Sequence, residues 1–153
     1  MKTVVSGQWS VVSWWKQFCL LIFAFCFFGC GSMPNLEPRE CSESGGVVKE
    51  FYSYHFGNEM KFSQENLKLR EKFLTTEFVK SLQNLQTEND VFTTNNTDFP
   101  KAFRVGKCEV VSPEKTTIEL VLFWRDDTRT EQKIIKVEVV KQSDKWLVNK
   151  ILN

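Results

Sequence analysis

The sequence has few of the residues from which catalytic and metal sites are usually built. It contains one histidine, His55, among 153 residues, and no two cysteines at Cys-x-x-Cys spacing. Structural zinc sites use cysteine and histidine ligands at short, regular spacings, so no metal site is predicted. Gly45-Gly46 is not part of a phosphate-binding pattern, so neither nucleotide binding nor another cofactor is predicted.

The chain also lacks an excess of charge of either sign. It has 20 Lys and Arg residues against 19 Asp and Glu residues. Two of the basic residues, Lys2 and Lys16, lie in the N-terminal segment discussed next, so the rest of the chain is close to neutral. Proteins that bind nucleic acid carry clustered basic residues, and no nucleic-acid partner is therefore predicted.

An apolar run without charged residues extends from Phe18 to Gly29, after Lys2 and Lys16. A basic start, an apolar stretch of roughly 7–15 residues and a small residue before the cleavage site are typical of a secretory signal peptide. The run is shorter than the about 20 apolar residues that a membrane-spanning helix needs. We predict that residues 1–29 are a signal peptide that is removed. The alternative is an uncleaved anchor that extends back to Val11 and includes Lys16.

The end of this run, Phe27-Phe28-Gly29-Cys30, resembles a bacterial lipobox. In that motif the cysteine is diacylated and becomes the new N-terminus. Phe27 and Phe28 depart from the usual pattern, which has Leu and a small residue at these positions. The resemblance implies lipidation of Cys30 and a membrane-anchored lipoprotein facing the periplasm. Gly31, in place of Asp, implies the outer membrane in a Gram-negative cell, and the alternative is an ordinary signal peptide followed by a cysteine.

A polar stretch with prolines follows, and we predict a lipid-anchored linker over residues 30–45 and one domain over residues 46–153. Apolar residues recur at helical spacing in residues 47–56, 67–73 and 78–85. The first half of the domain is therefore predicted to be helical.

From Ala102 onward the apolar period changes to two. This pattern predicts strands over residues 104–111, 117–124, 130–142 and 146–152, joined by short polar turns. Short turns between successive strands produce an antiparallel meander. The predicted fold class is α+β, with N-terminal helices packed on a curved four-stranded antiparallel sheet.

The order of these elements is similar to that of the nuclear transport factor 2-like (cystatin-like) superfamily. The residues that carry the resemblance are Phe51, Tyr52 and Tyr54 in the opening helix and the closing segment Trp146-Leu147-Val148-Asn149-Lys150-Ile151. Within that superfamily, the chain resembles an uncharacterised family of bacterial secreted and lipoprotein domains. The resemblance covers about residues 46–153. It implies a fold and a location in the cell envelope, but no reaction, because the fold supports enzymes, binding proteins and scaffolds alike.

Five aromatic or imidazole side chains are candidates for lining an interior cavity: Tyr52, Tyr54, His55, Trp124 and Trp146. Enzymes of the superfamily that transfer protons use a His–Asp or an Asp–Tyr pair. His55 has no acidic residue one turn away before the helix-ending Gly57, and we interpret it as a structural residue at the end of a helix. No catalytic residue is predicted.

Cys41 and Cys108 are the two cysteines of the predicted domain and linker that follow Cys30. In an oxidising compartment they could form one disulfide. The alternative is that each is a separate small side chain, and the sequence does not decide between these interpretations.

Two classes of function remain. The first is a non-catalytic module of the cell envelope that is anchored to the membrane and binds an envelope protein or a small apolar ligand. The second is a small hydrolase or isomerase that uses the interior of the fold. The first class predicts an apolar pocket or patch, and the second a carboxyl group with a raised pKa. A homodimer is an additional expectation, since the long strand over residues 130–142 could leave an open edge.

Overall fold

The computed structural model describes residues 36–152, and the predictions for the signal peptide and for Cys30 lie outside this part of the chain. The helical elements come first: α2 (Arg39–Phe56), α3 (Gln64–Arg70), the 3-10 helix η1 (Glu71–Phe73) and α4 (Thr76–Leu82). The strands follow: β1 (Ala102–Ser112), β2 (Lys115–Arg125), β3 (Thr130–Gln142) and β4 (Lys145–Leu152). Among the described residues, no helix is both long and apolar enough to cross a membrane.

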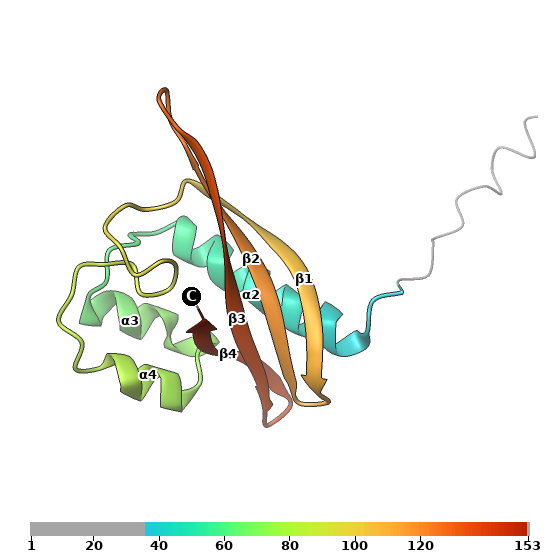
Figure 1. Ribbon diagram of the computed structural model, residues 1–153. Helices are drawn as coiled ribbons and strands as arrows, with labels where there is room; N and C mark the ends of the chain where they lie inside the picture. Colours follow the sequence, from blue (N-terminus) through green and yellow to red (C-terminus); the bar gives the residue numbers. More distant parts are fainter. Residues whose placement is uncertain (1–35, 153) are drawn as a thin grey trace, which may run out of the picture. The chain divides into compact units, whose positions relative to one another are not determined.

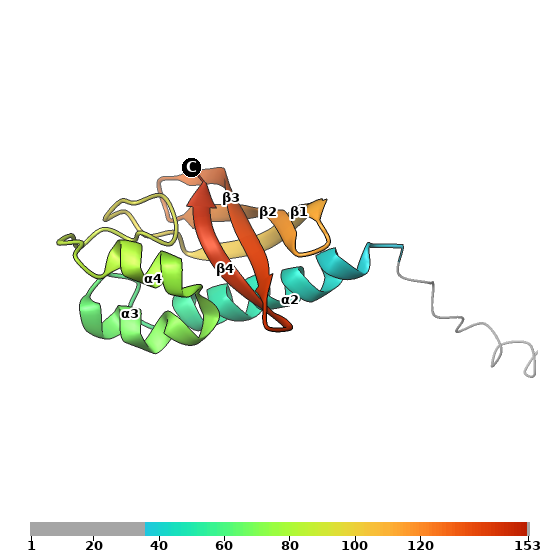
Figure 2. The same cartoon turned by 90° about the horizontal axis from the view of Figure 1, so that it is seen from below.

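The four strands form one antiparallel sheet in the order β1-β2-β3-β4. Helix α2 packs across one face of this sheet, and α4 lies beside β4 (Figures 1 and 2). The strand bounds lie within a few residues of those predicted from the alternation of apolar and polar residues. The predicted α+β fold, with N-terminal helices on a four-stranded antiparallel sheet, is confirmed.

Strand β2 shows why the sheet and α2 form a common core. Ile118, Leu120 and Leu122 are fully buried and point to the same face of the sheet, because successive side chains of a strand alternate between its faces. On this face they meet the buried side of α2, which includes Val48 and Phe51. Each such buried aliphatic side chain contributes roughly 1.5–3 kcal/mol to folding, so this layer dominates the stability of the domain.

Helix α2 begins at Arg39. The predicted linker over residues 30–45 is therefore wrong from Arg39 onward. The helix extends this far because Ser44 is fully buried against the sheet, where its Oγ accepts a hydrogen bond of 2.8 Å from Oγ1 of Thr116. Gly45 and Gly46 each cost a helix about 1 kcal/mol relative to alanine, and the contacts with the sheet offset that cost.

A disulfide between Cys41 and Cys108 joins the first turns of α2 to β1, with a Cα–Cα distance of 5.7 Å. Cys41 is buried and Cys108 half-buried. The sequence left open whether these two cysteines are bonded, and in the structure they form a disulfide. The disulfide fixes α2 against the sheet at the end where the described chain begins.

One edge of the sheet is covered by the segment that leads into α4. The backbone N–H of Thr75 donates to the carbonyl oxygen of Val148 in β4 at 3.0 Å, and its Oγ1 donates to Oδ1 of Asn149 at 2.9 Å. The same Oγ1 accepts from the backbone N–H of Phe78 and caps α4. One threonine thus pairs with the edge strand β4 and also caps the helix that follows it.

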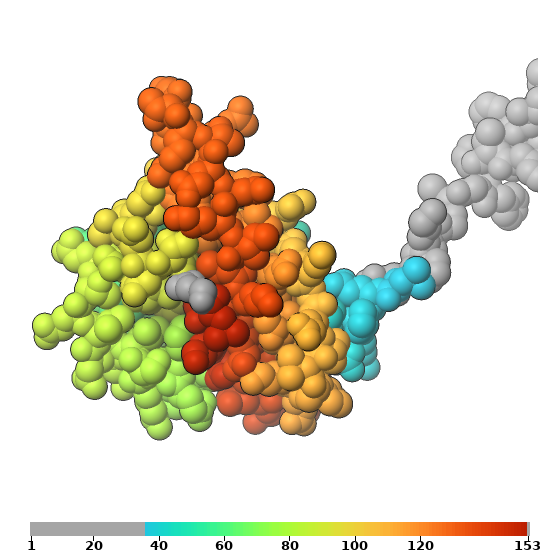
Figure 3. Space-filling view, in the orientation of Figure 1, coloured from blue at the N-terminus to red at the C-terminus, as the bar shows by residue number. Residues whose placement is uncertain are grey.

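Strand β3 pairs with β2 from Thr130 to Val140, but with β4 only from Lys136, which lies opposite Leu152. Residues 130–135 therefore leave an open edge on the β4 side. The prediction of an open edge in this strand is correct for its first half only. This half belongs to the β2–β3 hairpin that projects from the surface in Figure 3.

Candidate functional site

The single histidine is part of a buried chain of three polar side chains from three separate segments. His55 lies in the last turn of α2, Arg70 ends α3, and Asp90 lies in the loop between α4 and β1. Nε of Arg70 donates to Nδ1 of His55 at 2.9 Å. Nε2 of His55 lies 3.0 and 3.1 Å from the two carboxylate oxygens of Asp90. All three residues are at most 1% exposed.

These contacts fix the protonation of the imidazole. An arginine Nε–H can only donate, so Nδ1 of His55 must offer its lone pair. The ring proton is therefore on Nε2, where it is donated to Asp90. His55 is a neutral bridge between a cation and a carboxylate, and neither of its nitrogens is free to exchange a proton with a bound molecule.

The two ends of this chain are also fully bonded. The guanidinium of Arg70 donates to the backbone oxygens of Asn66 at 2.8 Å and Glu59 at 2.7 Å. The carboxylate of Asp90 accepts from Oγ1 of Thr93 at 2.7 Å and from a backbone N–H of its own loop at 3.0 Å. A buried polar group with every partner in place stabilises a unique arrangement of the elements it joins. The chain Arg70–His55–Asp90 thus ties α2, α3 and the loop together.

A hollow lies elsewhere, between the N-terminal half of α2 and the β3–β4 turn. We name it the α2–β4 groove, with a volume of about 660 Å³. It is lined by Arg39, Glu43, Val47, Glu50, Lys72, Phe73, Lys141, Asp144, Lys145, Trp146 and Leu147. Its apolar lining comes from the helix, η1 and β4, and charged side chains of both signs surround it. A volume of roughly 300–1,000 Å³ is typical of ligand sites.

Trp146 and Glu43 fix one wall of the groove. Nε1 of Trp146 donates to Oε2 of Glu43 at 3.0 Å, and Nε of Arg39 donates to Oε1 of the same carboxylate at 2.6 Å. These two hydrogen bonds lower the pKa of Glu43. On the opposite wall, Nζ of Lys72 lies 4.6 Å from the centre of the Phe73 ring. The groove therefore offers aromatic rings and charged groups that are held in place before any partner arrives.

The other predicted cavity residues lie in the core or at its rim. Tyr52 is fully buried, and its hydroxyl donates to the carbonyl oxygen of Phe92 at 2.6 Å; burial, with a smaller contribution from the charge of Asp90, raises its pKa well above the usual range. Trp124 is buried, and its Nε1 donates to a loop carbonyl at 3.0 Å. Tyr54 is half-buried beneath Lys72, whose Nζ lies 5.1 Å from its ring centre. Of the five candidates, only Trp146 lines the groove.

Sequence reasoning did not find the partners of His55. Arg70 is 15 and Asp90 is 35 residues away along the chain, whereas helical periodicity relates only residues three or four positions apart. Asp90 belongs to a polar stretch that resembles an ordinary exposed loop. One local signal was present, since an aspartate two residues before a phenylalanine N–H can form an Asx turn, as Asp90 does with Phe92.

A carboxyl group that acts as a general acid usually has a raised pKa. Four carboxyl groups have a pKa that departs from its ordinary value, and in each it is lowered: Glu43, Asp98, Asp126 and Glu138. Residues 36–152 also contain no group of three or more His, Cys, Asp and Glu side chains placed to hold a metal ion.

Comparisons with known proteins agree on the fold alone. No family model and no curated protein matches the chain. A crystal structure of a protein of unknown function from Bacteroides thetaiotaomicron matches with a TM-score of 0.51 and 20% identity, over 73% of this chain and 90% of that one. An Ntf2-like protein involved in plasmid conjugation matches with a TM-score of 0.45 and 12% identity, over 80% of this chain and 42% of that one. Helices followed by a four-stranded meander are also what the resemblance to the nuclear transport factor 2-like superfamily implies.

Proposed function

We propose that this protein is an exported bacterial lipoprotein of the cell envelope, anchored through Cys30, whose domain binds a partner and does not catalyse a reaction. The disulfide between Cys41 and Cys108 supports export, because such bonds persist in oxidising compartments and are rare in the cytosol. The sequence around Cys30 supports the lipid anchor. The location is then the periplasmic side of a membrane, the outer one in a Gram-negative cell.

The observation that carries the binding role is the α2–β4 groove. Its apolar lining is an indole, a phenyl ring and aliphatic groups. Around them lie the cations of Lys72, Lys141 and Lys145 and the carboxylates of Glu50 and Asp144. Such a mixture suits an extended peptide segment, which presents apolar and charged side chains in alternation. We therefore propose that the partner is another envelope protein that inserts such a segment.

The alternative, a hydrolase or isomerase using the interior of the fold, has less support. Proton chemistry needs a side chain that can reach the substrate and exchange a proton with it. Both nitrogens of His55 are occupied by Arg70 and Asp90, and the hydroxyl of Tyr52 is bonded to a backbone carbonyl. These polar groups of the interior thus form hydrogen bonds within the protein, and none of these atoms is left to exchange a proton with a substrate.

The anchor is tested by intact mass and membrane fractionation of the full chain beside a Cys30→Ala variant, both expressed in a bacterium. We expect the wild type to be cleaved before Cys30, to be heavier by a diacylglyceryl group and to sediment with membranes. The variant should be unprocessed or soluble. An unmodified wild-type mass would refute the anchor; cleavage elsewhere would then indicate a free secreted protein, and no cleavage an N-terminal membrane anchor.

The groove is tested by placing a photo-crosslinking amino acid at Glu50, which lines it, and at the neighbouring exposed Lys49, which does not. In living cells we expect position 50 to give one dominant crosslinked protein, identifiable by mass spectrometry, and position 49 to give at least fivefold less. Lys72→Glu and Lys145→Glu should weaken that crosslink, since both cations line the groove. Equal products from positions 49 and 50, or indifference to both charge reversals, would contradict the proposal.

A further inference from the structure

A second hollow lies at the other end of α2. We name it the Phe99 pocket, with a volume of about 420 Å³. It is lined by Phe56, Glu59, Met60, Lys61, Phe99, Pro100 and Lys101. The lining comes from the end of α2 with the turn after it, and from the three residues that lead into β1. It shares no residue with the α2–β4 groove.

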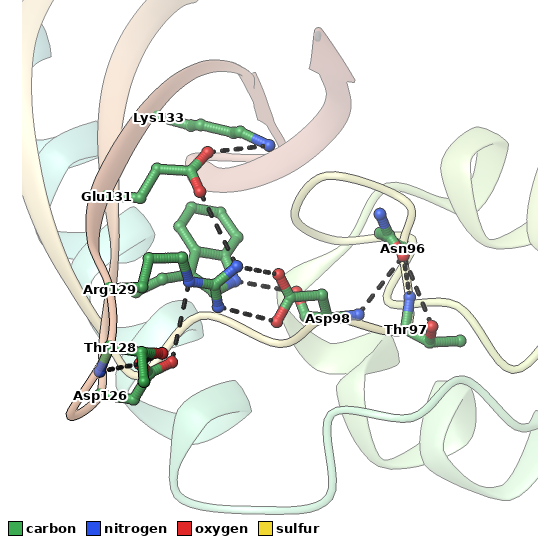
Figure 4. A network of polar contacts seen from close by, with 9 residues as sticks. Asn96, Thr97, Asp98, Asp126, Thr128, Arg129, Glu131 and Lys133 are labelled. Carbon is green, nitrogen blue, oxygen red and sulfur yellow. Dashed lines mark hydrogen bonds and ion pairs between the residues drawn. The ribbon is translucent and has the colours of Figure 1, made fainter.

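The wall formed by Phe99 and Pro100 is held rigidly by its neighbours. Asp98 makes two parallel bonds with the guanidinium of Arg129, at 2.8 and 3.1 Å, across the start of β3 (Figure 4). Arg129 lowers the pKa of Asp98 through these hydrogen bonds, so the pair stays ionised at neutral pH. On the other side, the backbone N–H of Lys101 donates to the carbonyl oxygen of Phe123 at 2.7 Å. The Asp98-Phe99-Pro100 element is thus fastened at both ends.

The facing wall is fixed as well. Nζ of Lys61 lies 2.6 Å from Oε1 of Glu88, and the backbone oxygen of Lys61 accepts from Nδ2 of Asn66 at 2.9 Å. Phe56 packs against Phe103 of β1, with 5.0 Å between their ring centres. A pocket whose walls are already ordered loses little conformational freedom when it is filled.

The pocket is apolar inside and carries cations at its rim. Phe56, Met60, Phe99 and Pro100 supply only carbon and sulfur side-chain atoms. Lys101 is exposed, and no ion pair within 4 Å involves its ammonium group in residues 36–152, although its charge helps to lower the pKa of Asp98, which is bonded to Arg129. Of the other charged side chains in the lining, Lys61 pairs with Glu88, and the charge of Glu59 acts on Arg70. An anionic head at this rim would therefore lie beside Lys101.

We propose that the Phe99 pocket binds an amphiphilic anion, with an aliphatic chain against the apolar walls and an anionic head beside Lys101. A free fatty acid and an anionic phospholipid share this chemistry. An uncharged or cationic amphiphile would fill the same walls but leave Lys101 without a counter-ion. This binding does not depend on the proposed groove or on the lipid at Cys30, because it uses different residues.

The experiment uses the full chain in isolated bacterial membranes and a decanoate probe that carries a diazirine on its chain. After irradiation, we expect mass spectrometry to find the adducts mainly on residues 59–61 and 99–101. Unlabelled decanoate should compete, and decyltrimethylammonium should compete at least tenfold less well. Octanoate should be about 15-fold weaker than decanoate, since each buried methylene tightens binding about fourfold.

Lys101→Glu should reduce labelling at least fivefold, because it reverses the charge at the rim without touching the core. Lys80→Glu, on the exposed surface of α4, is the matched control and should leave labelling unchanged. A second probe, with the same chain on phosphatidylglycerol, separates the sources: labelling by it alone assigns a lipid, and labelling by decanoate a free acid. Equal competition by the cationic amphiphile, labelling that Lys101→Glu does not reduce, or no labelling by either probe would overturn the proposal.

Discussion

Replacing Arg70 by methionine is expected to lower the free energy of unfolding by about 3–5 kcal/mol, because it leaves one charge of a buried pair without its partner. Methionine fills a similar volume, so the loss reflects charge and hydrogen bonding more than packing. Nδ1 of His55 would lose its donor, and Asp90 would keep a buried negative charge with no cation nearby. Urea denaturation followed by circular dichroism measures the change.

The control for this prediction is Lys68→Met, which removes an exposed cation from the same helix and should stay within about 0.5 kcal/mol of the wild type. Adding Asp90→Asn to Arg70→Met should recover part of the loss, since it removes the unpaired charge. A loss below about 1 kcal/mol for Arg70→Met would show that the three side chains are not coupled as the distances indicate.

The second large effect is expected from the disulfide. Cys41 and Cys108 are 67 residues apart. In the chain-entropy model, closing a loop of that length lowers the entropy of the unfolded chain and raises its free energy by about 4 kcal/mol. The double variant Cys41→Ala/Cys108→Ala should be destabilised by about that amount, and reducing the wild type with dithiothreitol should have the same effect. Denaturation curves with and without reductant measure both.

Two readouts make this prediction sharp. Dithiothreitol should not change the unfolding curve of the double variant, whereas it should shift that of the wild type. Without the disulfide, in the double variant or the reduced wild type, hydrogen exchange should be faster in the first turns of α2, around Cys41 and Ser44. It should stay slower near His55, which the hydrogen bonds to Arg70 and Asp90 still hold in place. Alkylation of both cysteines in the exported protein without prior reduction would contradict the bond.

The strands could be predicted from the sequence because their signal is local. Ile118, Leu120 and Leu122 lie on one apolar face and alternate with the mixed set Thr117, Glu119, Val121 and Phe123, and short turns separate each strand from the next. The helical spacing of apolar residues over 78–85 likewise predicted a helix where α4 lies. In both cases the information lies within a few residues of the element that it specifies.

The start of α2 and the partners of His55 could not be predicted because their causes are distant in the chain. Ser44 is held by Thr116, 72 residues later, and His55 by Asp90, 35 residues later. No helical period indicates such contacts, and Gly45-Gly46 argues locally against a helix. The same holds for the Asp98-Phe99-Pro100 element, whose role depends on Arg129 in the turn before β3.

The early start of α2 limits how far the domain can move from an anchor. If Cys30 carries the proposed lipid, eight residues, 31–38, separate it from the start of α2 at Arg39, and eight residues span at most about 28 Å when fully extended. Confinement to such a thin layer gives a partner in the same membrane an effective concentration far above its average value in the compartment, and short flexible tethers reach the millimolar range. A groove with only modest intrinsic affinity would then be occupied whenever its partner shares the membrane, and empty when the protein is released from it.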